Sequence, residues 1–183
     1  MLIKENLFAT PIWQQTLSQD FNNELLEECN SYKDPENIFS AETDNIKKLK
    51  KVISDAHMMI YYEYGPKGRE DLTQTVSING RLNTIKYGEN DTPHSHIGKS
   101  LLVGVYYLDV EDNSGDLLLH DPRGAVSWEK LNFTPDDPKG WTGRTYHRIK
   151  PKNGLLIMFP GFLIHSVETN LNSKLRKSIV IHI

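Results

Sequence analysis

The N-terminal part of the chain carries hydrophobic residues at helical spacing. One series predicts an amphipathic helix that buries a single face: Ile46, Leu49, Ile53, Ala56 and Ile60. A shorter helix is expected before it, with Asp20 as its N-cap and Leu25 and Cys29 on its apolar side. The opening residues, 7–17, are expected to be extended.

After residue 68 the pattern changes to short apolar runs separated by Gly, Pro, Asn and Asp. Runs of strand length occupy residues 75–78, 82–87, 100–108, 116–120, 144–149, 155–159, 163–168 and 177–183. Their number and the turn residues between them favour a β-sandwich or barrel. The predicted fold class is therefore mostly β, with N-terminal helices packed on the outside of one sheet.

The length of 183 residues fits one domain with a sizeable core. Within this single domain, 1–183, we expect residues 1–68 to form an N-terminal segment with supporting helices. Residues 69–183 would then form the β core. One stretch between strand runs, residues 127–143, has the length of a functional insertion such as a lid or binding loop.

Composition and charge exclude several classes of function. A net charge of −3 provides no basic field for nucleic acid or anionic lipid, so neither partner is expected. No apolar stretch approaches the roughly 20 residues needed to span a bilayer. The first residues also lack the unbroken apolar core of a signal peptide. The single cysteine, Cys29, excludes an internal disulfide. Together these features predict a cytoplasmic protein.

Three histidines form a candidate metal site. His94 and His96 stand just before a run rich in Leu, Val and Tyr. In an extended backbone, residues i and i+2 project from the same face, so these two imidazoles would converge. His165 lies in the apolar run GLLIMFPGFLIHSVE, where an unpaired imidazole would be costly. Because neutral imidazole is the commonest metal ligand in proteins, all three are candidate ligands.

A cationic residue follows the third histidine in the last predicted strand. Arg176 comes eleven residues after His165, and Ser178 shares its strand face. The turn-forming residues 170–173 would bring this strand back beside His165. A guanidinium with a neighbouring hydroxyl inside a barrel suits one end of a dicarboxylate, while the other end chelates a metal.

Other polar residues have two interpretations. His182 shares a face with Arg176 and Ser178, so it either points into the barrel or is a satisfied structural histidine. Tyr106 and Tyr107 alternate across the sheet, so one belongs to the core and the other could reach the pocket.

At these positions the chain resembles a known superfamily. A His-x-acid pair, a distal His and an Arg-x-Ser are the pattern of 2-oxoglutarate- and iron(II)-dependent oxygenases, which have a double-stranded β-helix (jelly-roll) fold. The matching positions are His94-Ser95-His96, His165 and Arg176-Lys177-Ser178. More narrowly, LFATPI, HSHIGKSLLVGVYYL, SGDLLLHDPR and GLLIMFPGFLIHSV resemble a small branch related to the prolyl hydroxylases, some members of which are carried by bacteriophages.

The resemblance implies an activity and six site residues. The metal ligands would be His94, His96 and His165, and the contacts to 2-oxoglutarate would be Arg176, Ser178 and Tyr87. The implied enzyme is an Fe(II) dioxygenase that hydroxylates a substrate and releases succinate and CO2. It needs no separate catalytic acid or base. A peptidyl or protein residue is the first candidate substrate, ahead of a small metabolite.

One departure from the family pattern keeps alternatives open. His96 stands where the family has an acid, although direct ligation by His96 is favoured because its spacing is that of the family. Asp116 or Asp121 could instead enter the metal sphere. A three-histidine cupin-type dioxygenase that uses no 2-oxoglutarate is a second hypothesis. A non-catalytic jelly-roll binding or structural protein is a third. An exposed edge strand would allow a homodimer.

Overall fold

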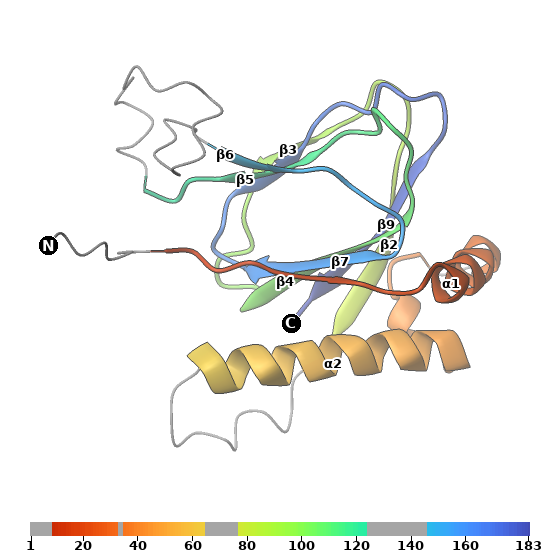
Figure 1. Ribbon diagram of the computed structural model, residues 1–183, viewed down its shortest axis with the longest axis horizontal. Helices are drawn as coiled ribbons and strands as arrows, with labels where there is room; N and C mark the ends of the chain where they lie inside the picture. The colour runs from red at the N-terminus through yellow and green to blue at the C-terminus, as the bar shows by residue number, and fades with distance from the viewer. Residues whose placement is uncertain (1–8, 33–34, 65–76, 124–145) are drawn as a thin grey trace, which may run out of the picture.

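The structure is a computed structural model that describes residues 9–32, 35–64, 77–123 and 146–183 (Figure 1). Its helices, in chain order, are α1 (Gln19–Ser31), a short 3-10 helix η1 (Ile38–Ser40) and α2 (Asp44–Tyr64). Its strands are β1 (Trp13–Thr16), β2 (Asn79–Ile85), β3 (Asp91–His94), β4 (Leu102–Asp109), β5 (Leu117–His120), β6 (Tyr146–Ile149), β7 (Leu155–Pro160), β8 (His165–Val167) and β9 (Arg176–His182).

The strands form two antiparallel sheets that face each other. One has five strands in the order β1-β7-β4-β9-β2, and the other has four in the order β3-β8-β5-β6. In Figure 1 the four-stranded sheet lies above the five-stranded sheet, and the connecting loops close the two ends. This arrangement is a jelly roll, so the predicted fold class is confirmed.

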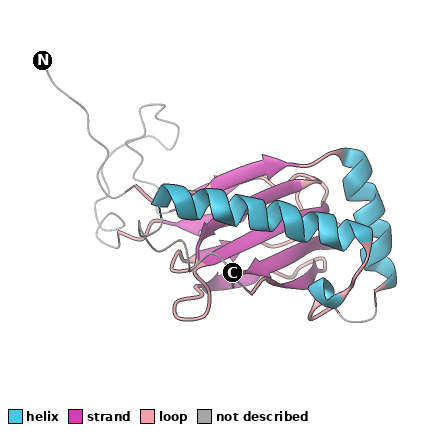
Figure 2. Cartoon of the chain, turned by 90° about the horizontal axis from the view of Figure 1, so that it is seen from below, coloured by secondary structure: helices cyan, strands magenta, loops and turns pink. Residues whose placement is uncertain are grey.

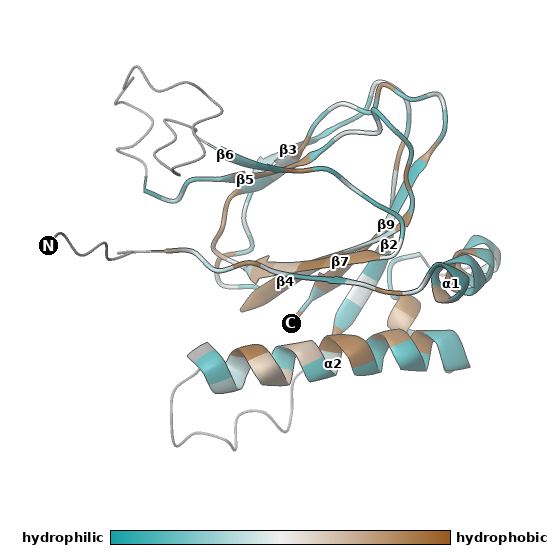
Figure 3. Ribbon diagram, in the orientation of Figure 1, coloured by the Kyte–Doolittle hydropathy of each residue, from teal (hydrophilic) through white to brown (hydrophobic). Residues whose placement is uncertain are grey.

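The helices cover the outer face of the five-stranded sheet. Figure 2 shows the long helix α2 lying across the strands, with α1 at one end. The predicted helical series is confirmed, because Ile46, Leu49 and Ile53 of α2 are fully or almost fully buried. They pack in one cluster with sheet residues such as Leu156 and Ile179. In Figure 3 the hydrophobic colouring of α2 and of strands β4 and β7 marks this layer.

The first helix begins at a different cap from the one predicted. Ser18, in extended backbone, precedes α1, and its Oγ accepts a hydrogen bond from the Phe21 N–H at 3.3 Å. The prediction of Asp20 as N-cap is therefore wrong. Asp20 lies in the first turn instead, where its negative charge complements the helix dipole. Both residues are common at helix starts, so local sequence alone did not separate them.

A second core fills the space between the two sheets. Strand alternation sends Tyr106 toward the helices, whereas Val103, Val105 and Tyr107 face the barrel interior. From the four-stranded sheet, Leu117, Leu119 and Val167 complete this interior cluster. Because β4 is buried on both faces, its sequence is an unbroken apolar run rather than an alternating pattern.

Two strands were not among the predicted runs. β3 has the sequence DTPH, which contains a proline and lies at the edge of its sheet. Proline is tolerated at an edge because no ladder hydrogen bond is lost there. β1 lies within the predicted extended segment and pairs with β7. The proposed insertion at 127–143, the boundary at 68 and the first two residues of the predicted runs 75–78 and 144–149 lie outside the described residues, so the domain division remains a prediction.

The predicted return of the last strand beside His165 is wrong in its pairing. β8 pairs with β3 and β5, whereas β9 pairs with β4 and β2 in the other sheet. The turn after Asn170 therefore carries the chain from one wall of the barrel to the other. Arg176 and Ser178 reach the interior from the opposite wall to His165.

None of the described helices combines the length and the apolar character that crossing a membrane would require.

Replacing Ile53 with Ala should test the helix layer. Ile53 is completely buried, so we expect its truncation to lower the free energy of unfolding by about 3 kcal/mol through lost burial and a residual cavity. Met59 on the same helix is 60% exposed, and Met59→Ala should change stability by no more than about 0.5 kcal/mol. Urea unfolding followed by circular dichroism measures both values. Equal losses would mean that α2 does not pack through this face.

Candidate metal centre

Three histidine side chains meet at one end of the barrel. His94 ends β3 and His165 begins β8, and the two are direct partners across these antiparallel strands. His96 follows two residues later in the loop that leads to β4. One ring nitrogen from each histidine lies within 4.8 Å of the others. The ring centroids are 4.3 Å apart for His94 and His165, and 5.2 Å apart for each pair that includes His96.

Backbone carbonyls orient two of these rings. The His94 Nδ1 lies 2.7 Å from the Thr92 carbonyl oxygen, and the His165 Nδ1 lies 2.9 Å from that of Leu163. A carbonyl can only accept, so Nδ1 carries the proton and donates in both cases. The Nε2 lone pair of each ring is then free, which is the tautomer that a metal needs.

His96 is held through its backbone. Its N–H donates to the Gly161 carbonyl oxygen at 2.8 Å, which ties the β3–β4 loop to the turn after β7. Only glycine fits at position 161, since a Cβ there would lie 2.0 Å from the Ser100 carbonyl oxygen. The His96 Nε2 is buried and has no hydrogen-bond partner among the described residues. A buried nitrogen without a hydrogen-bond partner is unusual, and coordination of a metal ion would use its lone pair.

Burial keeps two of the three imidazoles, those of His96 and His165, neutral. Desolvation lowers the pKa of His165 to about 4. The pKa of His96 is also lowered to about 4, first by burial and then by the neighbouring His182, His165 and His94 rings. At neutral pH both side chains therefore keep the lone pair that coordination requires.

The donor set fits a transition metal with nitrogen preference, such as iron or zinc. Neither aspartate considered from the sequence joins it. Asp116 pairs with Arg148 at 3.3 Å, and Asp121 pairs with Arg123 at 2.5 Å. Within the described part of the chain, the group that could hold an ion consists of His94, His96 and His165 alone.

A buried cation lies deeper in the same interior. Arg176 is 1% exposed, and its guanidinium carbon lies 5.1 Å from the centre of the Tyr107 ring. Its Nη1 donates to the Ser178 Oγ at 3.3 Å. The guanidinium lies close enough to the Tyr107 hydroxyl to affect its pKa, but by distance and angle neither that hydroxyl nor the Nε and Nη2 groups make a hydrogen bond to the described residues. A buried guanidinium with two free donor groups is costly, and an anion would relieve that cost.

Burial also changes the proton affinities of this deeper group. It lowers the pKa of Arg176 and raises that of Tyr107 to about 12, with the neighbouring guanidinium partly opposing the second shift. At neutral pH the phenol is protonated and can donate a hydrogen bond. Tyr107, Ser178 and Arg176 together form a donor-rich end of the barrel interior.

The sequence did not decide whether Tyr106 or Tyr107 reaches the pocket, and it predicted Tyr87 as a contact to 2-oxoglutarate. Tyr107 is the direct partner of Ser178 across β4 and β9, so the register of the two strands brings it to Arg176. Tyr87 lies in the turn after β2 and is 67% exposed. It is not part of the buried cluster, and its role in binding 2-oxoglutarate remains a prediction.

A jelly roll with three converging imidazoles at one end has the architecture of a metal-dependent jelly-roll protein. The family model described as "Putative 2OG-Fe(II) oxygenase" matches residues 82–182, more than half of the chain. The chain therefore belongs to this family of 2-oxoglutarate- and Fe(II)-dependent oxygenases. No curated protein matches it in sequence.

Solved structures support the same fold. A prolyl-4-hydroxylase from Pseudomonas putida is similar with a TM-score of 0.66 and 14% identity, over 96% of this chain and 88% of that one. The non-haem α-ketoglutarate-dependent epimerase SnoN from nogalamycin biosynthesis is similar with a TM-score of 0.61 and 11% identity, over 95% of this chain and 78% of that one. At these identities the likeness concerns the double-stranded β-helix fold.

Removing one imidazole should abolish metal binding. We expect His165→Ala to lower the affinity for Fe(II) by at least about 100-fold, because two remaining ligands cannot close the site. His57, a buried histidine on α2 outside the cluster, provides the control, and His57→Ala should leave Fe(II) affinity unchanged. Anaerobic calorimetry measures the affinities. Tight Fe(II) binding by His165→Ala would contradict the site.

Proposed function

We propose that this oxygenase uses Fe(II) and 2-oxoglutarate to hydroxylate a C–H bond of its substrate, with release of succinate and CO2. The observation that carries the proposal is the buried Arg176, whose Nε and Nη2 groups lack hydrogen-bond partners, in a jelly roll that also brings three imidazoles together. We propose that one dicarboxylate binds both groups. Bound iron with 2-oxoglutarate would activate dioxygen for the oxidation.

The protein's own contribution is to bind and orient. His94, His96 and His165 would hold the iron through three nitrogens and leave the remaining positions open. Arg176 would pair with the distal carboxylate of 2-oxoglutarate, assisted by donors from Ser178 and Tyr107. The surrounding side chains Val105, Ile157 and Phe159 would exclude water from the reacting groups.

The absence of a carboxylate from the ligand set has an electrostatic consequence. Three histidine ligands bring no negative charge to Fe(II), and the buried Arg176 adds a further positive charge to the interior. The two carboxylates of 2-oxoglutarate would offset two of these three positive charges, one near the metal and one at Arg176. Cosubstrate binding should therefore depend on iron more strongly than in a site with an acidic ligand.

A three-histidine dioxygenase without 2-oxoglutarate is the second candidate. The His-only donor set favours it. It gives no reason, however, for burying Arg176 in an interior where two of its N–H groups lack partners. The buried guanidinium therefore favours the 2-oxoglutarate-dependent reaction.

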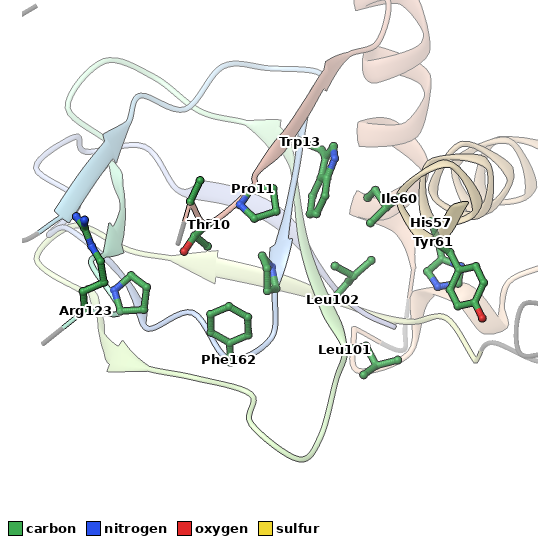
Figure 4. A pocket seen from close by; sticks show the side chains of 13 residues that line it. Thr10, Pro11, Trp13, His57, Ile60, Tyr61, Leu101, Leu102, Arg123 and Phe162 are labelled. Carbon is green, nitrogen blue, oxygen red and sulfur yellow. The ribbon is translucent and has the colours of Figure 1, made fainter. Parts of the chain in front are cut away.

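For the substrate, we propose a polypeptide with apolar residues near the modified one. A cavity of about 560 Å³, lined mainly by apolar side chains, lies between the N-terminal residues 9–13, the end of α2, the start of β4 and the turn after β7 (Figure 4). Leu101 and Phe162 line it and are 81% and 50% exposed. Ile97 and Ile164, next to His96 and His165, are exposed as well. This apolar surface extends beyond what a small metabolite held inside the barrel would cover.

A cytoplasmic location and the single-domain division remain predictions alongside this substrate.

Titration with 2-oxoglutarate should test the proposed reaction. Wild-type protein with Fe(II), kept free of oxygen, should develop the weak visible charge-transfer band of the chelate. We expect Arg176→Met to weaken 2-oxoglutarate binding by about 100-fold or more, because the distal carboxylate loses its partner. The variant should fold, since replacing a buried charge with an apolar side chain is often neutral or stabilising.

Lys177 provides the matched control for Arg176. It is the next residue of β9, and its Nζ is bound outside the barrel to the Asn30 side chain at 2.6 Å. Lys177→Met should keep wild-type affinity for 2-oxoglutarate. If both variants bind equally well, Arg176 does not hold the cosubstrate. Oxygen consumption without succinate would instead support the second candidate.

The substrate proposal predicts a separable effect at the apolar cavity. A pool of synthetic peptides rich in apolar residues should accelerate succinate formation by the wild type, and Phe162→Glu should remove the acceleration while leaving Fe(II) and 2-oxoglutarate binding intact. Leu171→Glu, an equally polar change in an exposed residue after β8, should behave like wild type. If peptides have no effect on the wild type, the polypeptide proposal is wrong.

A further inference from the structure

A fourth histidine, His182, lies against the candidate metal centre. It is the last residue of β9, and its ring centroid lies 4.7 Å from that of His96 with an angle of 67° between the planes. It is not a member of the group that could hold the ion. Its Nδ1 lies 3.1 Å from the Ser100 Oγ, a hydrogen bond that fixes the orientation of the His182 ring.

The three candidate ligands differ in how their rings are oriented. His94 and His165 each donate Nδ1–H to a backbone carbonyl, which fixes the ring plane and the tautomer. Metal-bound histidines almost always have such a partner. No side-chain hydrogen bond of this kind orients His96 among the described residues, and its Nε2 is buried without a partner. Another contact must therefore determine the direction of the His96 ring.

Among the described residues outside the candidate ligands, His182 is the one whose ring packs against that of His96, at a shorter centroid distance than the His94 and His165 rings. An edge-to-face arrangement of two rings is favourable and directional, so it restricts the rotation of His96 about its side-chain bonds. His182 is itself fixed by the hydrogen bond to Ser100 and by strand pairing on both sides, to Asn79 and to Val103. The loop between β3 and β4, which carries His96, is also bound to the end of β9, because the Leu101 N–H donates to the Ile183 carbonyl oxygen at 2.7 Å.

We propose that His182 is a positioning residue for the metal centre: its ring, held by Ser100, packs against His96 and aims the His96 nitrogen at the ion. The inference rests on the proposed metal centre and deepens it. Ring packing from β9 takes the place of the hydrogen bond that orients the other two ligands. His182 itself does not bind the ion.

The proposal is tested by metal binding and metal spectra rather than by turnover. Co(II) is the probe, because its visible absorption reports the number and arrangement of its ligands. We expect His182→Ala to weaken Co(II) binding by about 10- to 100-fold and to alter the spectrum, as the loss of a supporting residue does elsewhere. His182→Phe keeps an aromatic ring against His96, so it should retain affinity within about threefold and a spectrum like that of the wild type.

His120 is the matched control. It is also a half-buried histidine bound to a serine, with its Nε2 2.9 Å from the Ser166 Oγ, but it is outside the metal group. His120→Ala should leave the Co(II) affinity and spectrum unchanged. An effect of His120→Ala as large as that of His182→Ala would overturn the assignment, because any histidine-to-alanine change would then suffice.

A double-mutant cycle separates a role through His96 from a direct one. If His182 acts by orienting the His96 ring, adding His182→Ala to a His96→Asp variant, which keeps a ligand at this position but not the ring, should cause no further loss of Co(II) affinity. An additive loss would mean that His182 contacts the ion itself and would overturn the proposal. So would an unchanged affinity in the single variant His182→Ala, or a His182→Phe variant as weak as His182→Ala.

The controls also separate this inference from the proposed function. If the wild type does not bind Co(II), the metal centre is absent and the proposed function fails with it. If His165→Ala abolishes binding while His182→Ala does not change it, the metal centre stands and only the positioning role is wrong.

Discussion

The antiparallel pairing of β3 with β8 is the constraint on which the candidate site depends. It sets His94 directly opposite His165, so two imidazoles from distant parts of the sequence meet without any loop having to bring them together. The third imidazole depends on a much smaller contact, the hydrogen bond from the His96 N–H to the Gly161 carbonyl oxygen. The pairing of two strands and one hydrogen bond from a loop therefore define a site with three nitrogen ligands.

Strand alternation places the apolar residues that stabilise the fold on one face of β9 and the polar residues of the candidate site on the other. On β9, Ile179 and Ile181 face the helices and join the larger apolar cluster, while Arg176 and Ser178 face the barrel. Burying a guanidinium without an anion is unfavourable. The apolar layer on the other face of the same strand offsets this cost, which allows the interior to stay polar where a ligand would bind.

Sequence patterns predicted the elements whose signal is periodic and missed those whose signal depends on distant partners. The spacing of Ile46, Leu49 and Ile53 was enough for α2. The sequence DTPH gave no sign of strand β3, since an edge strand beside a metal site carries polar residues and a proline. The prediction that β9 returns beside β8 was wrong because turn residues indicate a reversal of the chain but not which sheet it enters next.

The same distinction applies within the site. Family spacing predicted Arg176 and the three histidines that the structure brings together, but the positions of Tyr107 and His182 follow from register. Tyr107 faces Ser178 only because β4 and β9 pair at that position, and His182 meets His96 only because the loop after β3 is fastened to the end of β9. Without an acid at position 96, a neutral ligand has no charge to draw it to the ion, so its aim depends on such packing contacts. A site built from neutral ligands therefore relies more on the residues around it than one that includes a carboxylate.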